Sequence, residues 1–308
     1  MRRPAPGTKL PPRADPPGVP LLRVALTFCL GLVGISTAAI FLRLALPAPP
    51  VVTGFYRMLF ASALVGLWLR LRGRALGAER RGVALALASG VCFGADLALW
   101  HSSLVLTTVA LSTLLVNTTP LYVGLYSRLT GERLHPRFVA GAGLALAGTA
   151  VLLGMPATPG GELRGAALAL AAGVFYAAYL LLMSAARRGL DAVRGLFWMG
   201  VSATATLGAA ALARGDAFAG FPASSWAAMG GAAVVAQVGG VMALVWSLGY
   251  LPATLASVAL LGQPVGTAIL GWLLLGEAVG AGQAAGGAAV LLGIGLASQA
   301  TRRRARPD

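Results

Sequence analysis

The chain has 308 residues, of which 57% are hydrophobic and only 11% are charged, and its formal net charge is +15. Soluble globular domains carry about 25% charged residues, so this composition excludes an ordinary soluble domain and predicts a polytopic all-α integral membrane protein. A single lysine, Lys9, excludes a Walker A loop, and two histidines at predicted helix ends on opposite sides, His101 and His135, exclude an HExxH-type site, so we expect no metal and no cofactor.

The predicted elements begin with a Pro- and Arg-rich segment, residues 1–20, which we expect to be a disordered cytoplasmic tail. Ten apolar runs follow, each about 17 to 25 residues long and therefore long enough to cross the hydrocarbon core of a bilayer. Residues 300–308 form a second, basic cytoplasmic tail. The ten predicted spans are 22–44, 51–69, 82–101, 106–127, 136–154, 164–185, 193–213, 225–247, 253–275 and 280–299.

Basic residues are distributed very unevenly between the two sides of these spans. Twenty of the 24 Lys and Arg residues fall in the tails and in alternate connections, whereas the opposite connections carry only Arg164 and Arg214. This positive-inside bias predicts that both termini are cytoplasmic, in a plasma (inner) membrane. The charge orients the protein and is available to anionic lipid, so nucleic acid is not expected as a partner.

The chain contains a tandem duplication. Residues 21–154 and 163–299 form two repeats of five predicted spans each, and an odd number of spans inverts the second repeat relative to the first. Inverted repeats are typical of secondary transporters, in which two halves exchange conformations around one site. The matched positions are Gly131-Glu132, Gly141 and Gly148 with Gly276-Glu277, Gly286 and Gly293, then Trp100 with Trp246, and Pro120 with Pro264. The paired glycines are interpreted as helix-packing residues, and Glu132 and Glu277 as caps of the next helix.

Two charged residues inside the predicted spans are candidates for a site. Asp96 is the only acidic residue well inside a span, and a charge there usually faces a cavity or a partner because it is costly in lipid. It either meets a cationic substrate group or a coupling proton, beside Trp100, or forms a structural ion pair with Arg57 or Arg43. Arg57 has two possible functional roles, binding a substrate carboxylate or gating the outer mouth. The alternatives are that its side chain snorkels to the membrane interface or forms an ion pair.

Proline occurs at matching places in the fourth and ninth spans, Pro120 and Pro264, next to Asn117 and Gln263. Proline frees a backbone carbonyl that lipid cannot satisfy, so these positions are interpreted as a paired hinge or site, with simple helix packing as the alternative. The second repeat adds Tyr176, Tyr179 and Gln237. The predicted substrate-binding residues are Asp96, Trp100, Asn117, Tyr176, Tyr179, Gln237 and Gln263, and the predicted gating or hinge residues are Arg57, Pro120 and Pro264.

Over residues 21–299 the chain resembles the EamA family of the drug/metabolite transporter superfamily. The resemblance rests on PVGTAILGWLLLGE at 264–277, on the shorter PLYVGLYSRLTGE at 120–132 and on Arg57 within FYRMLFASALV. It implies a ten-helix bundle with helices 1–4 and 6–9 around a central cavity, and transport of small metabolites, often export of amino acids. Asp96 matches no motif position of the family.

These observations favour a secondary transporter of a small metabolite, an amino acid or related compound, working as an exporter by alternating access. The partners expected are a small-molecule substrate and membrane lipid. Two alternatives remain open: a non-transporting membrane scaffold or sensor, and a membrane-embedded enzyme acting on a lipid-linked substrate. The scarcity of acidic and histidine residues counts against the enzyme.

Overall fold

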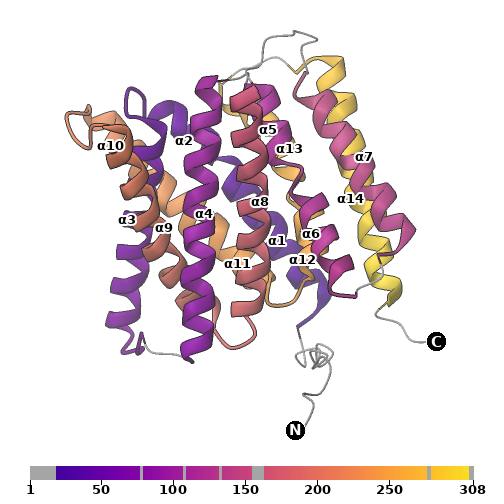
Figure 1. Ribbon diagram of the computed structural model, residues 1–308, viewed down its shortest axis with the longest axis horizontal. Coiled ribbons are helices and arrows are strands. Elements are labelled where there is room, and N and C mark those ends of the chain that lie inside the picture. Colours follow the sequence, from indigo (N-terminus) through magenta and orange to yellow (C-terminus); the bar gives the residue numbers. More distant parts are fainter. Residues whose placement is uncertain are drawn as a thin grey trace, which may run out of the picture.

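The computed structural model describes residues 19–76, 79–106, 109–131, 134–154, 163–275 and 279–304, and every regular element within them is helical (Figure 1). The predicted caps Glu132 and Glu277 and most of the two tails lie outside the described residues. In chain order the helices are α1 (Leu21–Ser36), α2 (Ala38–Leu44), α3 (Pro50–Leu71), α4 (Arg80–Leu106), α5 (Val109–Val116), α6 (Thr119–Leu129), α7 (Pro136–Leu152), α8 (Leu163–Ala186), α9 (Ala192–Arg214), α10 (Ala223–Gly231), the π-helix η1 (Ala232–Val241), α11 (Met242–Ser247), α12 (Ala253–Ala259), α13 (Gly262–Leu275) and α14 (Ala281–Arg304).

Eight helical stretches of the described chain are long and apolar enough to cross a membrane, which makes this an integral membrane protein. The two other predicted spans are helical but shorter. α7 has 17 residues, and the fourth predicted span is divided into α5, with 8 residues, and α6, with 11. The eight stretches are Leu21–Leu44, Pro50–Leu71, Arg80–Ser103, Leu163–Ala186, Ala192–Arg214, Ala223–Ser247, Ala253–Leu274 and Ala281–Gln299.

One predicted boundary is wrong. Residues 102–105 separate the predicted spans 82–101 and 106–127 and were expected to form a turn, but they are helical because α4 continues to Leu106. Ser102 and Ser103 donate to the carbonyls of Ala98 and Trp100, both at 2.7 Å, so their hydroxyl groups are satisfied within the helix and do not end it. At the C-terminus α14 runs to Arg304, and its membrane-spanning stretch ends at Gln299, where the tenth predicted span also ends.

The fourth and ninth predicted spans both break just before their prolines. α5 and α6 are separated at Asn117-Thr118, with Pro120 as the second residue of α6, and α12 and α13 are separated at 260–261, with Pro264 as the third residue of α13. Side chains at the first break satisfy nearby carbonyls: the Asn117 amide donates to Thr113 O at 2.7 Å, and Thr118 donates to Leu115 O at 2.6 Å. The prolines therefore lie at interruptions of the helix, and their role as hinges stays a prediction.

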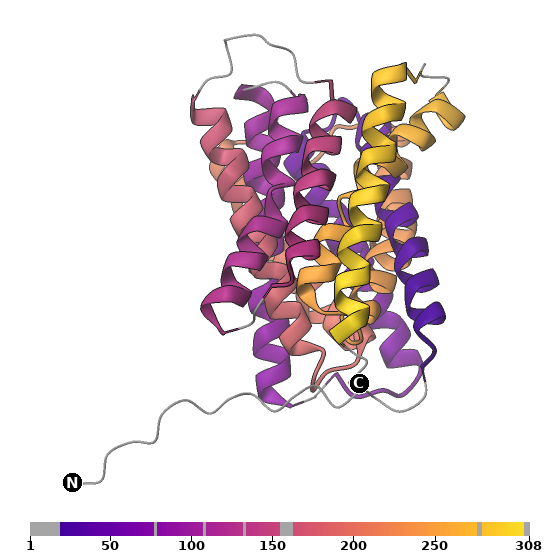
Figure 2. The ribbon, with the colours of Figure 1, turned by 90° about the vertical axis from the view of Figure 1, so that its right-hand side faces the viewer.

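α7 and α14 lie side by side at one edge of the bundle (Figures 1 and 2). Their glycines face one another: a Cβ atom added at Gly141 would lie 2.6 Å from Gly293 O, and one added at Gly148 would lie 2.8 Å from Gly286 O. The lower number of one helix meets the higher number of the other, so the two helices are antiparallel. The interpretation of these four glycines as packing residues is supported by these contacts.

A Gly148→Ala substitution is expected to destabilise the protein by about 1–3 kcal/mol, because its Cβ would meet the Val290 backbone nitrogen at 2.7 Å and the two helices would have to separate. Thermal unfolding of the detergent-purified protein measures this. Gly143→Ala is the matched control, since a Cβ at Gly143 in the same helix meets nothing within 4 Å. Equal melting temperatures for the two variants would contradict the packing account.

Most helix contacts join the first half of the chain to the second. α4 packs on α8 and α9, α3 packs on α9 and η1, and α1 packs on η1, α11 and α13. The largest buried apolar cluster draws on these helices, with Met58, Met183, Met199 and Leu207 among its fully buried members. This arrangement brings polar residues of both halves together inside the bundle.

Candidate functional site

Arg57 and Gln237 join the two halves at the centre of the site. Arg57 comes from α3, and its Nε and Nη2 atoms donate to Gln237 Oε1 at 3.1 and 2.8 Å. Gln237 comes from η1 and is only 1% exposed. Of the roles predicted for Arg57, snorkelling to the interface is therefore not what the structure shows: its guanidinium bonds to a buried amide of the other repeat.

The backbone around Gln237 is a π-helix, η1, which has wider turns than an α-helix. Such segments are rare and occur frequently at functional sites. η1 approaches α1 very closely, since a Cβ added at Gly240 would lie 2.7 Å from the Ile35 nitrogen, and one added at Gly34 would lie 2.6 Å from the Gly240 Cα. Close packing on α1 thus holds η1 in place, and with it the Gln237 side chain that bonds to Arg57 of α3.

Asp96 lies on α4 and is 6% exposed. The ion pairs within the described residues are Arg194–Asp191 and Arg214–Asp216, so no ion pair joins Asp96 to Arg57 or Arg43 there. The structural ion pair considered for Asp96 is therefore not observed. An uncompensated carboxylate at this depth is costly, which favours the alternative that it meets a ligand or a proton.

Aromatic residues connect Asp96 with Arg57. Tyr176 and Tyr179 of α8 stack with ring centroids 5.6 Å apart, and Phe93 of α4 lies 4.8 Å from the Tyr179 ring. The two tyrosine hydroxyl groups are within electrostatic range of both Arg57 and Asp96. The structure thus brings five predicted site residues into one region: Arg57, Asp96, Tyr176, Tyr179 and Gln237.

The described chain contains four buried polar side-chain atoms without a hydrogen-bond partner: Thr53 Oγ1, Trp100 Nε1, His101 Nδ1 and Gln237 Nε2. Gln237 bonds to Arg57, Thr53 precedes Arg57 by one helical turn, and His101 interacts electrostatically with Arg57. Buried polar atoms are nearly always bonded, so these four unpaired atoms are candidates for contact with a ligand or with water.

Sequence reasoning missed Thr53 and His101 as site residues. Thr53 is four residues before Arg57, so helical spacing alone could have placed it on the same face. His101 follows Trp100, whose ring centroid is 5.2 Å from that of His101, and it approaches α3, where a Cβ at Gly54 would lie 3.8 Å from His101 Cε1.

Asn117 and Gln263, with their prolines, lie at the helix breaks rather than in contact with Arg57. The Asn117 side chain bonds within its own helix segment, and Thr119 reaches Gly173 O of α8 at 3.2 Å, one turn from Tyr176. At the other break Ser36 of α1 donates to Gln263 O at 3.2 Å. The described contacts therefore place these residues against α8 and α1, and their role in binding stays a prediction.

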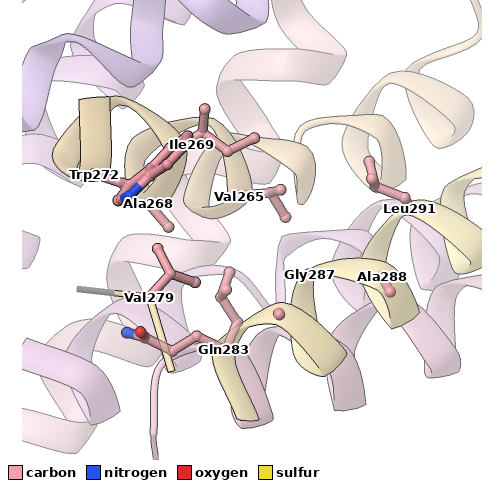
Figure 3. A pocket seen from close by; sticks show the side chains of 11 residues that line it. Val265, Ala268, Ile269, Trp272, Val279, Gln283, Gly287, Ala288 and Leu291 are labelled. Atoms are coloured by element: carbon pink, nitrogen blue, oxygen red, sulfur yellow. The ribbon is translucent and has the colours of Figure 1, made fainter. Parts of the chain in front are cut away.

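An apolar groove of about 600 Å³ lies between α13 and α14 (Figure 3). Its lining is almost wholly apolar, with Trp272 and Gln283 as the residues with a polar atom, and Gln283 Oε1 already accepts from Gly280 N at 3.0 Å. None of the predicted site residues lines this groove. It is a peripheral hollow separate from the Arg57 region.

A Gln237→Glu substitution is expected to give Arg57 a permanent carboxylate partner in the same place. We expect an unchanged or higher melting temperature, because the variant forms a charge-assisted hydrogen bond, and at least about a tenfold loss of ligand binding and flux. Gln283→Glu, at an exposed helix start, is the control with the same chemical change and should leave flux unaltered. Normal flux in Gln237→Glu would show that Arg57 takes no anionic ligand.

Comparison with known proteins agrees with this architecture. The model of the EamA-like transporter family matches residues 22–154 and again residues 163–299. A solved structure described as "Crystal structure of protein" is 22% identical, with a TM-score of 0.76 over 91% of this chain and 99% of the other, which shows a shared fold. None of the curated proteins compared with this chain matches it. Since the two family matches together cover most of the sequence, the chain belongs to the EamA-like transporter family, part of the drug/metabolite transporter superfamily.

Proposed function

We propose that this protein is a secondary transporter that exports a small zwitterionic metabolite, an amino acid or related compound, by alternating access. The observation that carries the proposal is the presence of one basic side chain, the half-buried Arg57, and one acidic side chain, the buried Asp96, neither of which has an ion-pair partner among the described residues. Family membership supports transport rather than enzymatic catalysis.

Each end of a zwitterion has a suitable partner in the site. The Arg57 guanidinium has five N–H donors, and two of its nitrogens bond to Gln237, so it can still donate to a carboxylate. Gln237 Nε2, which is buried without a partner and belongs to the amide that Arg57 contacts, is a further donor for the same group. Trp100 Nε1 is also buried without a partner, one helical turn from Asp96. Asp96 would accept from an ammonium group, with the stacked Tyr176 and Tyr179 rings offering cation–π contact.

Alternating access needs two halves that can exchange roles. In the proposed arrangement the ten predicted spans form two inverted five-helix repeats with both termini cytoplasmic, in the plasma membrane. The antiparallel packing of α7 on α14, the last helices of the two repeats, supports it. The contacts between the repeats support it too, because they occur in matching pairs. The third span of the first repeat (α4) packs on the first and second spans of the second repeat (α8 and α9), and the third span of the second repeat (η1) packs on the first and second spans of the first repeat (α1 and α3).

Flux from proteoliposomes tests the proposal. Vesicles with purified protein are loaded with a mixed cytosolic extract and diluted, and the released solutes are identified by mass spectrometry against protein-free vesicles. Selective release of amino acids or related zwitterions is expected. Retention of every solute by vesicles that contain folded protein, with and without a proton gradient, would contradict transport and favour the scaffold alternative.

A further inference from the structure

The end of α3 combines an exposed apolar stripe with a cluster of positive charge. Leu64, Leu67, Trp68 and Leu71 are 45%, 55%, 40% and 77% exposed. Their spacing of three and four residues places them on one face of the helix, pointing away from the bundle. In an integral membrane protein such a face lies against lipid acyl chains, up to the point where the helix ends.

A tight turn at Gly73 follows the last residue of α3. Gly73 adopts a left-handed conformation with φ of 62°, Gly73 N donates to Arg70 O at 3.0 Å, and Arg74 N donates to Leu69 O at 2.9 Å. These two bonds define a Schellman motif, in which glycine is favoured because it carries no Cβ. The motif holds Arg72 and Arg74 on either side of the glycine, at the end of the apolar stripe.

Both arginines converge on one aromatic ring. The guanidinium carbons of Arg72 and Arg74 are each 5.7 Å from the centroid of the Trp68 ring. The chain after them is anchored to α9, because Arg194 Nε donates to Ala75 O at 2.9 Å and Trp198 Nε1 donates to Leu76 O at 3.3 Å. The positions of the two guanidinium groups are thus set by a hydrogen-bonded segment of the chain.

No ion pair joins Arg72 or Arg74 to an acidic residue in the described part of the chain. Of the acidic residues in this region, Glu79 is directed at Gly189, where an added Cβ would lie 2.5 Å from its Oε2, and Asp191 pairs with Arg194 at 3.1 Å and accepts from the backbone at the start of α9. Two like charges held at one ring repel each other, and an anion placed between or over them would relieve that repulsion. The site therefore fits a ligand with a negative head and an apolar chain.

We propose that Trp68, Arg72 and Arg74 bind the phosphate of an anionic phospholipid, whose acyl chain lies along Leu64, Leu67 and Leu71. The stripe ends α3 and the charge pair lies in the turn that follows directly, so one lipid molecule can contact both. The indole ring of Trp68 lies at the boundary between them, where tryptophan is enriched in membrane proteins. With the membrane orientation proposed above, this lipid belongs to the cytoplasmic leaflet.

The test is lipid binding by the full-length protein purified in a neutral detergent. Phosphatidylglycerol, phosphatidylcholine, short-chain dihexanoyl-phosphatidylglycerol and inorganic phosphate are titrated separately, and the rise in melting temperature gives the apparent affinity of each. Phosphatidylglycerol is expected to bind at least about tenfold more tightly than the other three. Equal binding of phosphatidylcholine would overturn the charge argument, and equal binding of inorganic phosphate would reveal a free-anion site.

Arg72→Gln with Arg74→Gln should lower the affinity for phosphatidylglycerol by about tenfold or more, because the lipid phosphate loses both of the guanidinium groups that the site places beside it. Arg128→Gln with Arg137→Gln removes the same charge at two exposed positions on α6 and α7 and is the matched control. Equal losses of phosphatidylglycerol affinity in the two double variants would show that only the net charge of the protein matters, and would overturn the proposed site. If the double variant fails to fold, Arg74→Gln alone is measured, with a loss of about threefold or more expected. Flux plays no part in the readout, so failure here leaves the transport proposal untouched.

Discussion

Replacing Arg57 by alanine is expected to reduce solute flux by at least about a hundredfold while the protein still folds. Among the described residues the Arg57 guanidinium bonds to the buried amide of Gln237, and two charge-assisted hydrogen bonds to a substrate carboxylate would contribute about 3–6 kcal/mol together. The measurement is the initial rate of export from proteoliposomes at matched protein content. Some loss of stability, about 1–3 kcal/mol, should accompany it, because Gln237 loses its partner.

Arg57→Lys and Arg164→Ala complete this experiment. Lysine keeps the charge but cannot reproduce the planar fork of donors, so Arg57→Lys should remain impaired. Arg164 is exposed at the start of α8, and its loss should leave flux unchanged. Flux within about twofold of wild type in Arg57→Ala would show that the Arg57–Gln237 link only packs the helices.

Replacing Asp96 by asparagine is expected to weaken transport and strengthen the fold together. Losing a charged hydrogen bond to a substrate ammonium group should raise the KM about 10- to 100-fold, since such bonds are worth about 1.5–3 kcal/mol. Stability should stay equal or rise, because a buried carboxylate without an ion-pair partner becomes a neutral amide of the same shape. Initial rates over a range of substrate concentrations and the melting temperature measure the two effects.

A structural role for Asp96 predicts the opposite pattern, with an unchanged KM and a lower melting temperature. The same variant also tests energy coupling. If Asp96 carries a proton, flux driven by a pH gradient disappears in Asp96→Asn while downhill exchange persists. If wild type and variant respond equally to the gradient, Asp96 has no part in coupling.

The sequence predicts the layout of the chain well because lipid imposes strong rules on it. Apolar length predicted ten spans, of which eight are helices that can cross a membrane, and internal repetition identified the two halves that the family model matches. Pro120 and Pro264 correctly indicated where two spans are interrupted. The turn expected at residues 102–105 was wrong, since Ser102 and Ser103 bond to carbonyls of their own helix and remain helical.

The site was only partly predictable because its contacts cross between the repeats. Arg57 and Gln237 are 180 positions apart, and no local pattern indicates that their side chains meet. The π-helix around Gln237 has no distinctive sequence signal either, as η1 reads as an ordinary apolar run with two glycines. Asp96 could be selected because a charge in lipid is unusual, and helical spacing from Arg57 could have selected Thr53, whereas His101 becomes notable only once its burial without a partner is seen.

The most direct test of a zwitterion site between Arg57 and Asp96 is competition during counterflow. Proteoliposomes exchange a labelled form of the solute released from the cytosolic extract, in the presence of its analogue lacking the amino group or its analogue lacking the carboxylate. The account predicts that each analogue competes at least about tenfold more weakly than the parent compound. In Asp96→Asn, the analogue lacking the amino group should compete almost as well as the parent compound, whereas the analogue lacking the carboxylate should remain the weaker competitor. Equal competition by parent and analogues would contradict the account, because recognition would then not involve the two charges.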